Sequence, residues 1–373
     1  MRKSGSSMQG SSCTVLITGG AGFVGTNVAK RLAGEGVRVR ILDSLARAGS
    51  EQNIAWLAAE YPDRVEFVRG DVRDRAVVQE AVIGVEHIYH FAAQVAVTTS
   101  LVDPFTDFDV NARGTLNLLE AARACATPPS LVYSSTNKVY GGLADVQVQA
   151  IGDRYVPTDE RVRASGISEK RGLEFHSPYG CSKGAADQYV LDYSRSYGLR
   201  TVVMRMSCIY GPHQHGNEDQ GWVAHFVRSA LADKDVTVYG DGRQVRDVLF
   251  VADLVDAFER ARANVDRLSG CVFNIGGGPQ NTLSVLELIA NVERITQRKM
   301  RVARDEWRVG DQRYYVSDIR SFGTAAGWRA RINVSAGLSA LINWFGEARR
   351  AEAPAIQPFT PVKTMTASEV QIR

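Results

Sequence analysis

Cysteine is scarce in this 373-residue chain, and its five cysteines are odd in number and widely spaced. No two of them have the C-x-x-C spacing, so the sequence indicates neither a disulfide framework nor a zinc site. The chain also lacks an apolar run approaching the roughly 20 residues of a membrane span, and it lacks the massed basic block typical of nucleic-acid proteins. We therefore expect a cytoplasmic protein with reduced thiols, no metal ion, no membrane anchor and no nucleic-acid partner.

The two ends of the chain differ in composition from the rest. Residues 1–11 are rich in Ser and Gly and have no apolar signal-peptide core, which predicts a flexible tail. Residues 351–373 contain three prolines among small and polar residues, which predicts a loosely held extension. The whole chain is 45% hydrophobic and 23% charged, with a net charge of +3, and it is long enough to bury a large core.

A glycine turn follows the first apolar run. Residues 15–17 read as a buried strand, and Gly19, Gly22 and Gly25 come directly after it, before an amphipathic segment at 24–32. Glycines at this spacing allow a tight turn, close approach of the backbone to a pyrophosphate and close packing of the following helix. The helix N-terminus then offers its amides to the phosphates, so the turn predicts a dinucleotide site.

An acidic residue ends the second predicted strand, residues 37–42. Asp43 lies about 20 residues beyond the glycine turn, where a carboxylate accepts hydrogen bonds from the adenosine ribose. A carboxylate there repels a 2′-phosphate, so Asp43 favours NAD over NADP. Arg40 and Arg47 lie nearby in the sequence and act against that preference.

Further apolar runs at 65–68, 87–91, 131–133 and 201–204 read as strands, and they alternate with helical segments. One of these segments covers 105–126. This alternation is typical of a doubly wound parallel sheet, that is, an α/β fold of the Rossmann type.

A hydroxyl cluster and a tyrosine–lysine pair suggest the chemistry. Ser134, Ser135 and Thr136 follow the strand at 131–133, at the edge of the sheet where ligands bind. Tyr179 and Lys183 are four residues apart and share one face of a predicted helix. The combination indicates proton transfer to and from a sugar or alcohol hydroxyl, whereas either group alone arises often by chance.

Arginines recur beside glycine turns in the last third of the chain, at Arg243, Arg246, Arg308 and Arg313. A guanidinium group matches the geometry of phosphate oxygens, so these residues are candidates for a diphosphate clamp. Exposed surface arginines are the alternative interpretation, and the sequence leaves both open.

The motifs together resemble the extended short-chain dehydrogenase/reductase family, over residues 12–347. They are the segments 18–25, 70–72, 111–115, 134–141, 179–183 and 243–247, with Asp43. Four blocks, at 134–141, 176–189, 219–222 and 242–247, are similar to a subgroup that inverts C2 of a CDP-hexose.

The resemblance implies a NAD-binding Rossmann domain over residues 12–205 and a smaller C-terminal α/β domain over 206–350 that binds a nucleotide-diphosphate sugar. Segments near 245–275 are expected to return to the Rossmann sheet. Tyr179 is expected to act as the base, with Lys183 binding the nicotinamide ribose and depressing the pKa of the tyrosine. Thr136, with Ser135, is expected to bind the reacting hydroxyl.

The family pattern also assigns binding residues. Those expected at NAD are Gly19, Gly22, Phe23, Val24, Gly25, Asp43, Asp71, Val72, Phe91, Ala92, Ala93, Asn111, Ser134, Tyr179, Lys183 and Met206. Those expected at the substrate are Gln94, Asn137, Lys138, Ser207, Gln220, Val238, Tyr239, Arg243, Gln244, Arg246, Arg308 and Asp311.

The resemblance implies a homodimer through the helices of Asn111 and Tyr179, or a tetramer. Three other functions are compatible with parts of the pattern: a UDP-sugar 4-epimerase, a nucleotide-sugar 4,6-dehydratase and a non-catalytic NAD-binding regulator. A dehydratase needs an Asp-Glu pair where this chain has Asn137 and Lys138, and a regulator has no need of Tyr179, Lys183 and Thr136 together.

Overall fold

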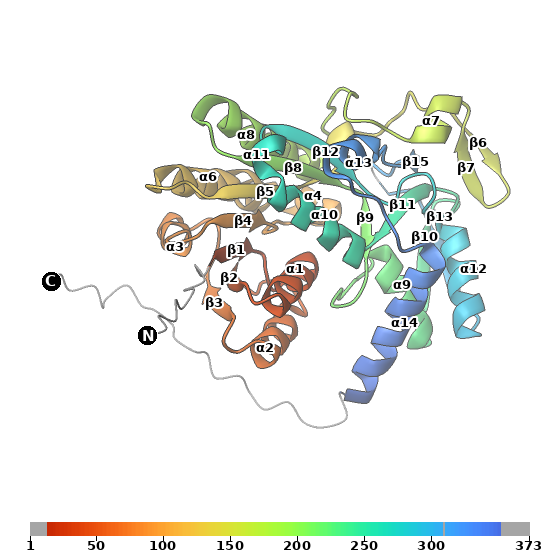
Figure 1. Cartoon of the computed structure of the whole chain (residues 1–373). Coiled ribbons are helices and arrows are strands. Elements are labelled where there is room, and N and C mark those ends of the chain that lie inside the picture. The colour runs from red at the N-terminus through yellow and green to blue at the C-terminus, as the bar shows by residue number, and fades with distance from the viewer. Residues whose placement is uncertain (1–12, 309, 352–373) are drawn as a thin grey trace, which may run out of the picture.

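A parallel sheet of seven strands forms the centre of the molecule (Figure 1), in the order β12-β8-β5-β4-β1-β2-β3. The computed structural model describes residues 13–308 and 310–351, so the tail expected at 1–11 and the extension expected beyond 351 lie outside the described residues. The strands are β1 (Thr14–Thr18), β2 (Arg38–Asp43), β3 (Val65–Arg69), β4 (His87–His90), β5 (Ser130–Thr136), β8 (Thr201–Met206) and β12 (Cys271–Ile275). Their order and parallel pairing confirm the predicted doubly wound fold.

Alternation along β1 shows why the sheet has two covered faces. Val15 and Ile17 pack into one apolar core, while Leu16 between them packs into the other, and all three are fully buried. The helices of the first core are α1 (Phe23–Gly34), α2 (Ser50–Glu60) and α10 (Val251–Ala263). Those of the second core are α3 (Arg75–Ala81), α6 (Gly114–Ala124) and α8 (Ser177–Tyr197), on the opposite side of the sheet in Figure 1.

The helical segment expected at 105–126 contains an irregular turn. It consists of α5 (Pro104–Phe108), a π-helical turn (Asp109–Arg113) and α6. The preceding α4 (Val97–Val102) packs with α5 on α8. A single π turn widens the helix locally and often marks a functional site, and here it contains Asn111.

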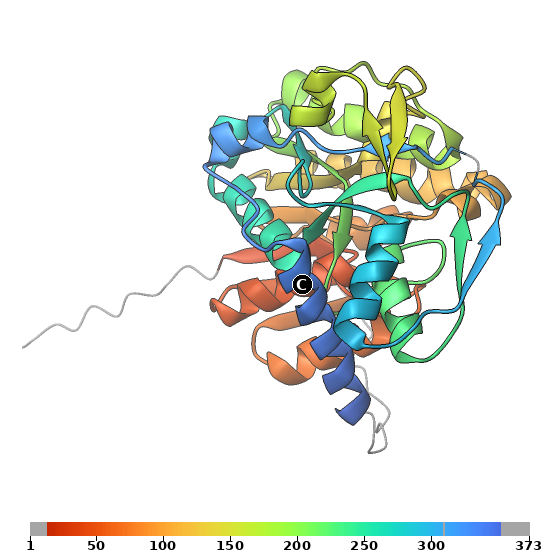
Figure 2. The ribbon, with the colours of Figure 1, turned by 90° about the vertical axis from the view of Figure 1, so that its right-hand side faces the viewer.

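The second half of the chain adds a smaller α/β unit at one end of the sheet (Figure 2). It contains a mixed sheet of β9 (Cys208–Tyr210), β11 (Val245–Phe250), β13 (Thr282–Ser284) and β15 (Tyr314–Tyr315), and a parallel pair of β10 (Val236–Tyr239) and β14 (Val302–Asp305). Helices α9 (Trp222–Leu231), α12 (Val285–Thr296) and α14 (Val334–Ala351) pack against one another beside them. The remaining elements are a hairpin of β6 (Val148–Ile151) and β7 (Arg154–Pro157), a 3-10 turn (Asn137–Tyr140), and the short helices α7 (Glu160–Ser165), α11 (Val265–Leu268) and α13 (Arg320–Ala326).

The chain returns from this unit to the central sheet, where β12 pairs with β8 at the edge and α10 packs on α1. The domain boundaries at 205 and 350 stay predictions. Within the described residues, no helix combines the length and apolar character needed to cross a membrane.

A buried ion pair holds α8 to the sheet. Asp187 accepts two hydrogen bonds from Arg205 on β8, at 2.9 and 2.8 Å, and the two side chains are 0% and 3% exposed. Ser135 on β5 donates to the same carboxylate at 2.7 Å, and Arg205 also donates to the Tyr140 hydroxyl at 3.1 Å. These contacts fix the helix of Tyr179 relative to strands β5 and β8.

We predict that Asp187→Ala destabilises the protein by about 3–5 kcal/mol, because it leaves the Arg205 guanidinium buried without its counter-charge. Urea unfolding of the purified variant measures the change. Asp266→Ala is the matched control, since Asp266 forms an exposed pair with Arg200 and should change the free energy of unfolding by less than about 1 kcal/mol. Equal effects of the two substitutions would show that the buried pair does not hold α8.

Candidate active site

A cavity of about 640 Å³ runs along the carboxyl ends of the central strands. It opens where β1 and β4 lie side by side and their following loops diverge, which is the ligand position of a doubly wound sheet. Most residues predicted to bind NAD line it: Gly19, Gly22, Phe23, Val24, Gly25, Asp43, Asp71, Val72, Phe91, Ala92, Ala93, Ser134, Tyr179, Lys183 and Met206. Gln94, Ser135 and Gln220 also line this cavity.

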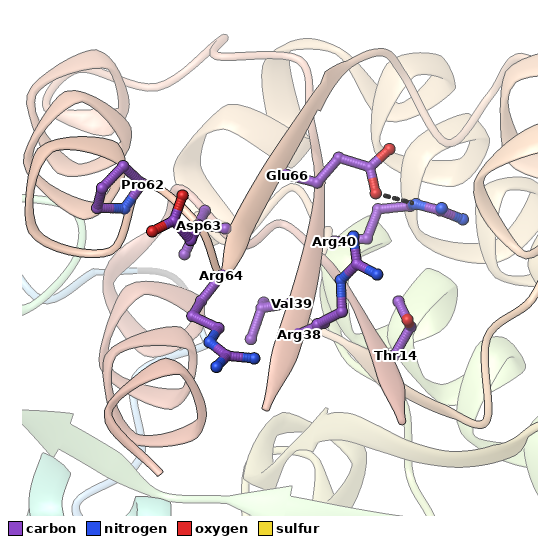
Figure 3. A pocket seen from close by; sticks show the side chains of 9 residues that line it. Thr14, Arg38, Val39, Arg40, Pro62, Asp63, Arg64 and Glu66 are labelled. Carbon is purple, nitrogen blue, oxygen red and sulfur yellow. Dashed lines mark hydrogen bonds and ion pairs between the residues drawn. The ribbon is translucent and has the colours of Figure 1, made fainter. Parts of the chain in front are cut away.

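A second hollow, of about 360 Å³, lies at the opposite edge of the sheet, where β1, β2 and β3 begin (Figure 3). Arg40 points into this region and donates to Glu66 at 2.9 Å and to the carbonyls of Ala81 and Ile83. Its guanidinium is therefore engaged far from the carboxyl end of β2, and it does not act against the preference of Asp43 for NAD.

The glycine turn leaves no room for side chains. Gly19 has a φ of +69°, and a Cβ atom there would lie 2.6 Å from the backbone nitrogen of Ala92. A Cβ atom at Gly25 would lie 2.5 Å from the carbonyl oxygen of Gly19. The backbone thus forms an open cradle at the N-terminus of α1, which fits the diphosphate of a dinucleotide.

Asp43 is held by the backbone around it. Its Oδ2 accepts from the Ala21 amide at 3.0 Å and its Oδ1 from the Leu45 amide at 2.8 Å. Burial raises the pKa of this carboxyl group, while the backbone hydrogen bonds and the charge of Arg47 act in the opposite direction. The carboxylate is oriented at the rim of the cavity, and the residues present fit the ribose of NAD.

Asn111 was expected at the cofactor, but it does not line the cavity. Its side chain is 1% exposed, and its Oδ1 accepts from the Gln94 amide at 2.9 Å. Its Nδ2 donates to the Gln94 carbonyl, to Asp107 and to Ser182 on α8. The π turn therefore places Asn111 as an anchor that joins the cavity loop after β4 to α8.

Tyr179 lines the cavity and is in contact with Thr136. Burial raises the pKa of the tyrosine to about 12, Asp107 adds to the increase, and the Thr136 contact and Arg47 oppose it. The phenol is neutral near pH 7 in this structure, and an added positive charge nearby would be needed to make it a base.

Lys183 lies one helical turn beyond Tyr179. Its Nζ donates to the Ser134 carbonyl at 2.6 Å and lies 4.3 Å from the centre of the Tyr133 ring. Burial lowers the pKa of this lysine to about 7, although Asp187 and Asp107 act against the decrease. Arg47 is the cation whose charge acts to lower the pKa of Tyr179 in this structure, and the role expected of Lys183 at that tyrosine stays a prediction.

Ser135 differs from its expected role as a partner of the reacting hydroxyl. Its Oγ donates to Asp187, so the side chain is turned toward the buried ion pair. Thr136, the next residue, is the hydroxyl that contacts Tyr179. Ser135 belongs to the support of the site.

A charged cluster lies on the other side of Thr136, beyond the walls of the cavity. Arg246, 8% exposed, contacts Asp311 at 2.5 Å, and the Lys138 ammonium donates to the Gly310 carbonyl at 3.4 Å. Gly310 and Asp311 thus connect the end of β5 to β11. Three residues predicted to bind substrate, Lys138, Arg246 and Asp311, meet here.

The four arginines predicted to form a diphosphate clamp lie in different places in the structure. Arg308 stacks on Tyr239 at 3.9 Å and donates to the Glu218 carbonyl at 3.1 Å, on the loop that also carries Asp219. Arg243 donates to the Gly152 carbonyl of the β6–β7 hairpin, and Arg313 lies over the Tyr155 ring. Only Arg246 belongs to the charged cluster just described.

The remaining predicted substrate residues have structural partners. Asn137 contacts the Thr136 hydroxyl, Ser207 donates to Asp247, and Gln244 donates to the Tyr239 carbonyl. Val238 is 1% exposed and packs in the apolar core of the C-terminal unit, so its side chain is not available to a ligand.

Arg47 and the loop at 213–219 are cavity residues that the sequence did not assign, whereas Gln220, which follows them, was predicted to bind substrate. Arg47 donates to Gln220, and His215 lies against Gly49, so the loop covers the cavity from the C-terminal side. The residues are separated by more than 160 positions in sequence, and no local pattern relates them.

Comparison with known proteins agrees with this geometry. The NAD dependent epimerase/dehydratase family matches residues 15–276, more than half of the chain. The chain belongs to this family. NAD is accordingly the cofactor of the cavity, and the chain is an NAD-dependent nucleotide-sugar epimerase by its relatives.

Three of these relatives show the range of activities. The CDP-paratose 2-epimerase of Salmonella typhi is 41% identical over 88% of this chain and 98% of its own length. The UDP-glucose 4-epimerase of Thermus thermophilus, solved with NAD, has a TM-score of 0.75, with 32% identity over 90% of this chain and 99% of that one. The dTDP-glucose 4,6-dehydratase DesIV of Streptomyces venezuelae, also with NAD, has a TM-score of 0.77, with 29% identity over 91% and 98%.

We predict that NAD lowers the pH at which Tyr179 ionises. A phenol becomes a phenolate above its pKa, and burial holds that pKa at about 12 without cofactor, whereas a cationic nicotinamide stabilises the phenolate. The ultraviolet absorbance difference between the protein and Tyr179→Phe, recorded during a pH titration, isolates this group. The difference should develop at lower pH in the NAD-bound protein, and identical titrations with and without NAD would contradict the prediction.

Proposed function

We propose that this protein inverts C2 of a CDP-hexose. The observation that supports this substrate class is the 41% identity to the CDP-paratose 2-epimerase of Salmonella typhi, over 98% of that protein. The catalytic chemistry rests on the contact between Thr136 and Tyr179, which lines the NAD cavity.

The residues of this chain have separate tasks in the proposal. Thr136 holds the reacting sugar hydroxyl, and Tyr179 takes its proton and later returns it. Lys183 binds the nicotinamide ribose from its position beside Ser134. NAD supplies the chemistry of removing a hydride from the ring carbon and giving it back to the opposite face. Because the cofactor is regenerated, it can stay bound, held by Asp43 and the glycine turn.

The other activities of the family fit this chain less well. A 4,6-dehydratase removes water and needs a carboxylate pair after the threonine, where this chain has Asn137 and Lys138. A UDP-sugar 4-epimerase uses the same tyrosine, lysine and threonine and differs in how the sugar is held.

Arg246 and Arg308 are proposed to bind the substrate diphosphate, because a guanidinium group fits phosphate oxygens.

A panel of CDP-, UDP-, GDP- and dTDP-hexoses, incubated with the protein in deuterium oxide and followed by NMR of the products, tests the function. We expect inversion at C2 of a CDP-hexose with protium retained at that carbon, since the hydrogen leaves and returns without meeting solvent. Deuterium at the inverted carbon would mean removal of a proton rather than a hydride. Inversion only at C4 would keep the mechanism and reject the substrate class.

We also propose that the protein works as a homodimer or tetramer in the cytoplasm. An exposed apolar surface covers α4, α5 and α8, which pack together, and its members are Leu101, Val102, Phe105, Phe108, Tyr189 and Tyr197. Val102 is 86% and Phe105 is 84% exposed, which favours a second copy covering this surface. The five cysteines are free thiols, as suits a reducing compartment.

Phe105→Asp should therefore shift the protein from dimer toward monomer in sedimentation equilibrium, because a carboxylate at the centre of an apolar interface is costly to bury. Ile83→Asp is the matched control, since Ile83 is 66% exposed outside this surface and should leave the mass unchanged. A monomeric parent protein, or a variant that remains as associated as its parent, would reject this interface.

A further inference from the structure

Lys138 follows the end of β5, the strand that carries Thr136, and lies where this strand meets the C-terminal unit. Its backbone amide donates to Thr136 Oγ1 at 3.2 Å, and Thr136 in turn contacts Tyr179. Its side chain lies outside the cofactor cavity and reaches the Gly310 carbonyl over 3.4 Å. Lys138 is thus joined both to the site of proton transfer and to the loop that carries Asp311.

The charges around Lys138 are out of balance. Asp311 is already paired with Arg246 at 2.5 Å, so two cations face one carboxylate. Among the described residues, the half-buried ammonium of Lys138 has a single hydrogen bond, the long one to Gly310. Burial and the charge of Arg246 lower the pKa of Lys138, against the effect of Asp311. An anion bound here would relieve the repulsion, and phosphate oxygens suit both cations.

In a nucleotide sugar, the anion that could bind beside Lys138 is the diphosphate. The diphosphate is bonded through oxygen to C1, which is the direct neighbour of C2 and lies across the ring from C4. When the C2 hydroxyl contacts Thr136 and Tyr179, the sugar-proximal phosphate must lie close to those residues. When the C4 hydroxyl occupies that position, the same phosphate is carried away by the width of the ring.

We infer that Lys138, with Arg246, binds the sugar-proximal phosphate of the substrate and thereby places C2, and not C4, opposite Tyr179. This inference rests on the proposed function, since it explains why the inverted carbon is C2. It makes Lys138 a residue that determines the site of reaction on the sugar, at the position where a dehydratase needs a carboxylate.

Binding of CDP and CMP to the NAD-loaded protein, measured by calorimetry, tests the phosphate contact without turnover. CDP has the phosphate that Lys138 would bind, and CMP lacks it. Lys138→Met should weaken the binding of CDP by about tenfold or more, because it removes one member of a partly buried charge contact. The affinity for CMP should stay within about twofold of that of the parent protein. Lys138→Arg keeps the charge and should retain most of the CDP affinity. Lys234→Met, at an exposed lysine, should change neither.

Retained NAD content shows that the variants are folded. An unchanged CDP affinity in Lys138→Met, or an equal loss of affinity for CDP and for CMP, would overturn the inference. Steady-state kinetics of C2 inversion should show the loss chiefly as a raised KM for the CDP-hexose. Failure of the proposed function is distinguishable, because it appears as no C2 inversion by the parent protein, whereas failure of this inference appears in binding.

Discussion

The ion pair between Asp187 and Arg205 is the contact on which the active site depends. Tyr179 and Lys183 are on a helix, and Thr136 is on a strand, so their closeness requires α8 to keep one position on the sheet. Asp187 holds that position by accepting from Arg205 on β8 and from Ser135 on β5, out of contact with water. Asn111 holds another part of the same helix, because its side chain donates a hydrogen bond to Ser182 on α8.

Tyr179 stands between two environments of different electrostatic character. On the cofactor side lie Asp43 and Arg47, with the open glycine cradle beside them. Outside the cavity lie Lys138, Arg246 and Asp311, with an excess of positive charge. Burial raises the pKa of the phenol, and a bound ligand that adds positive charge would act to lower that pKa.

Most of the fold could be predicted from local patterns in the sequence. Strand lengths, the glycine turn, Asp43 and the Tyr179–Lys183 spacing depend on residues close together in the chain, and the structure places them in the sheet, the cavity and α8 as expected. Asn111 and Ser135 were assigned to ligand contact, but their partners are on other elements and make them anchors. Arg47 was seen only as a neighbour of Asp43, because its contact with Gln220 spans 173 residues.

The sequence by itself determined the doubly wound sheet, the glycine turn at the NAD cavity and the shared helix face of Tyr179 and Lys183, since each follows from periodicity or from spacing within one turn. Tertiary structure alone decided that Ser135 turns to Asp187, that Arg47 reaches Gln220, and which arginine lies beside Lys138. These outcomes depend on how helices and loops from distant parts of the chain pack against β5. Packing of this kind is set by the whole core, and no short stretch of sequence contains it.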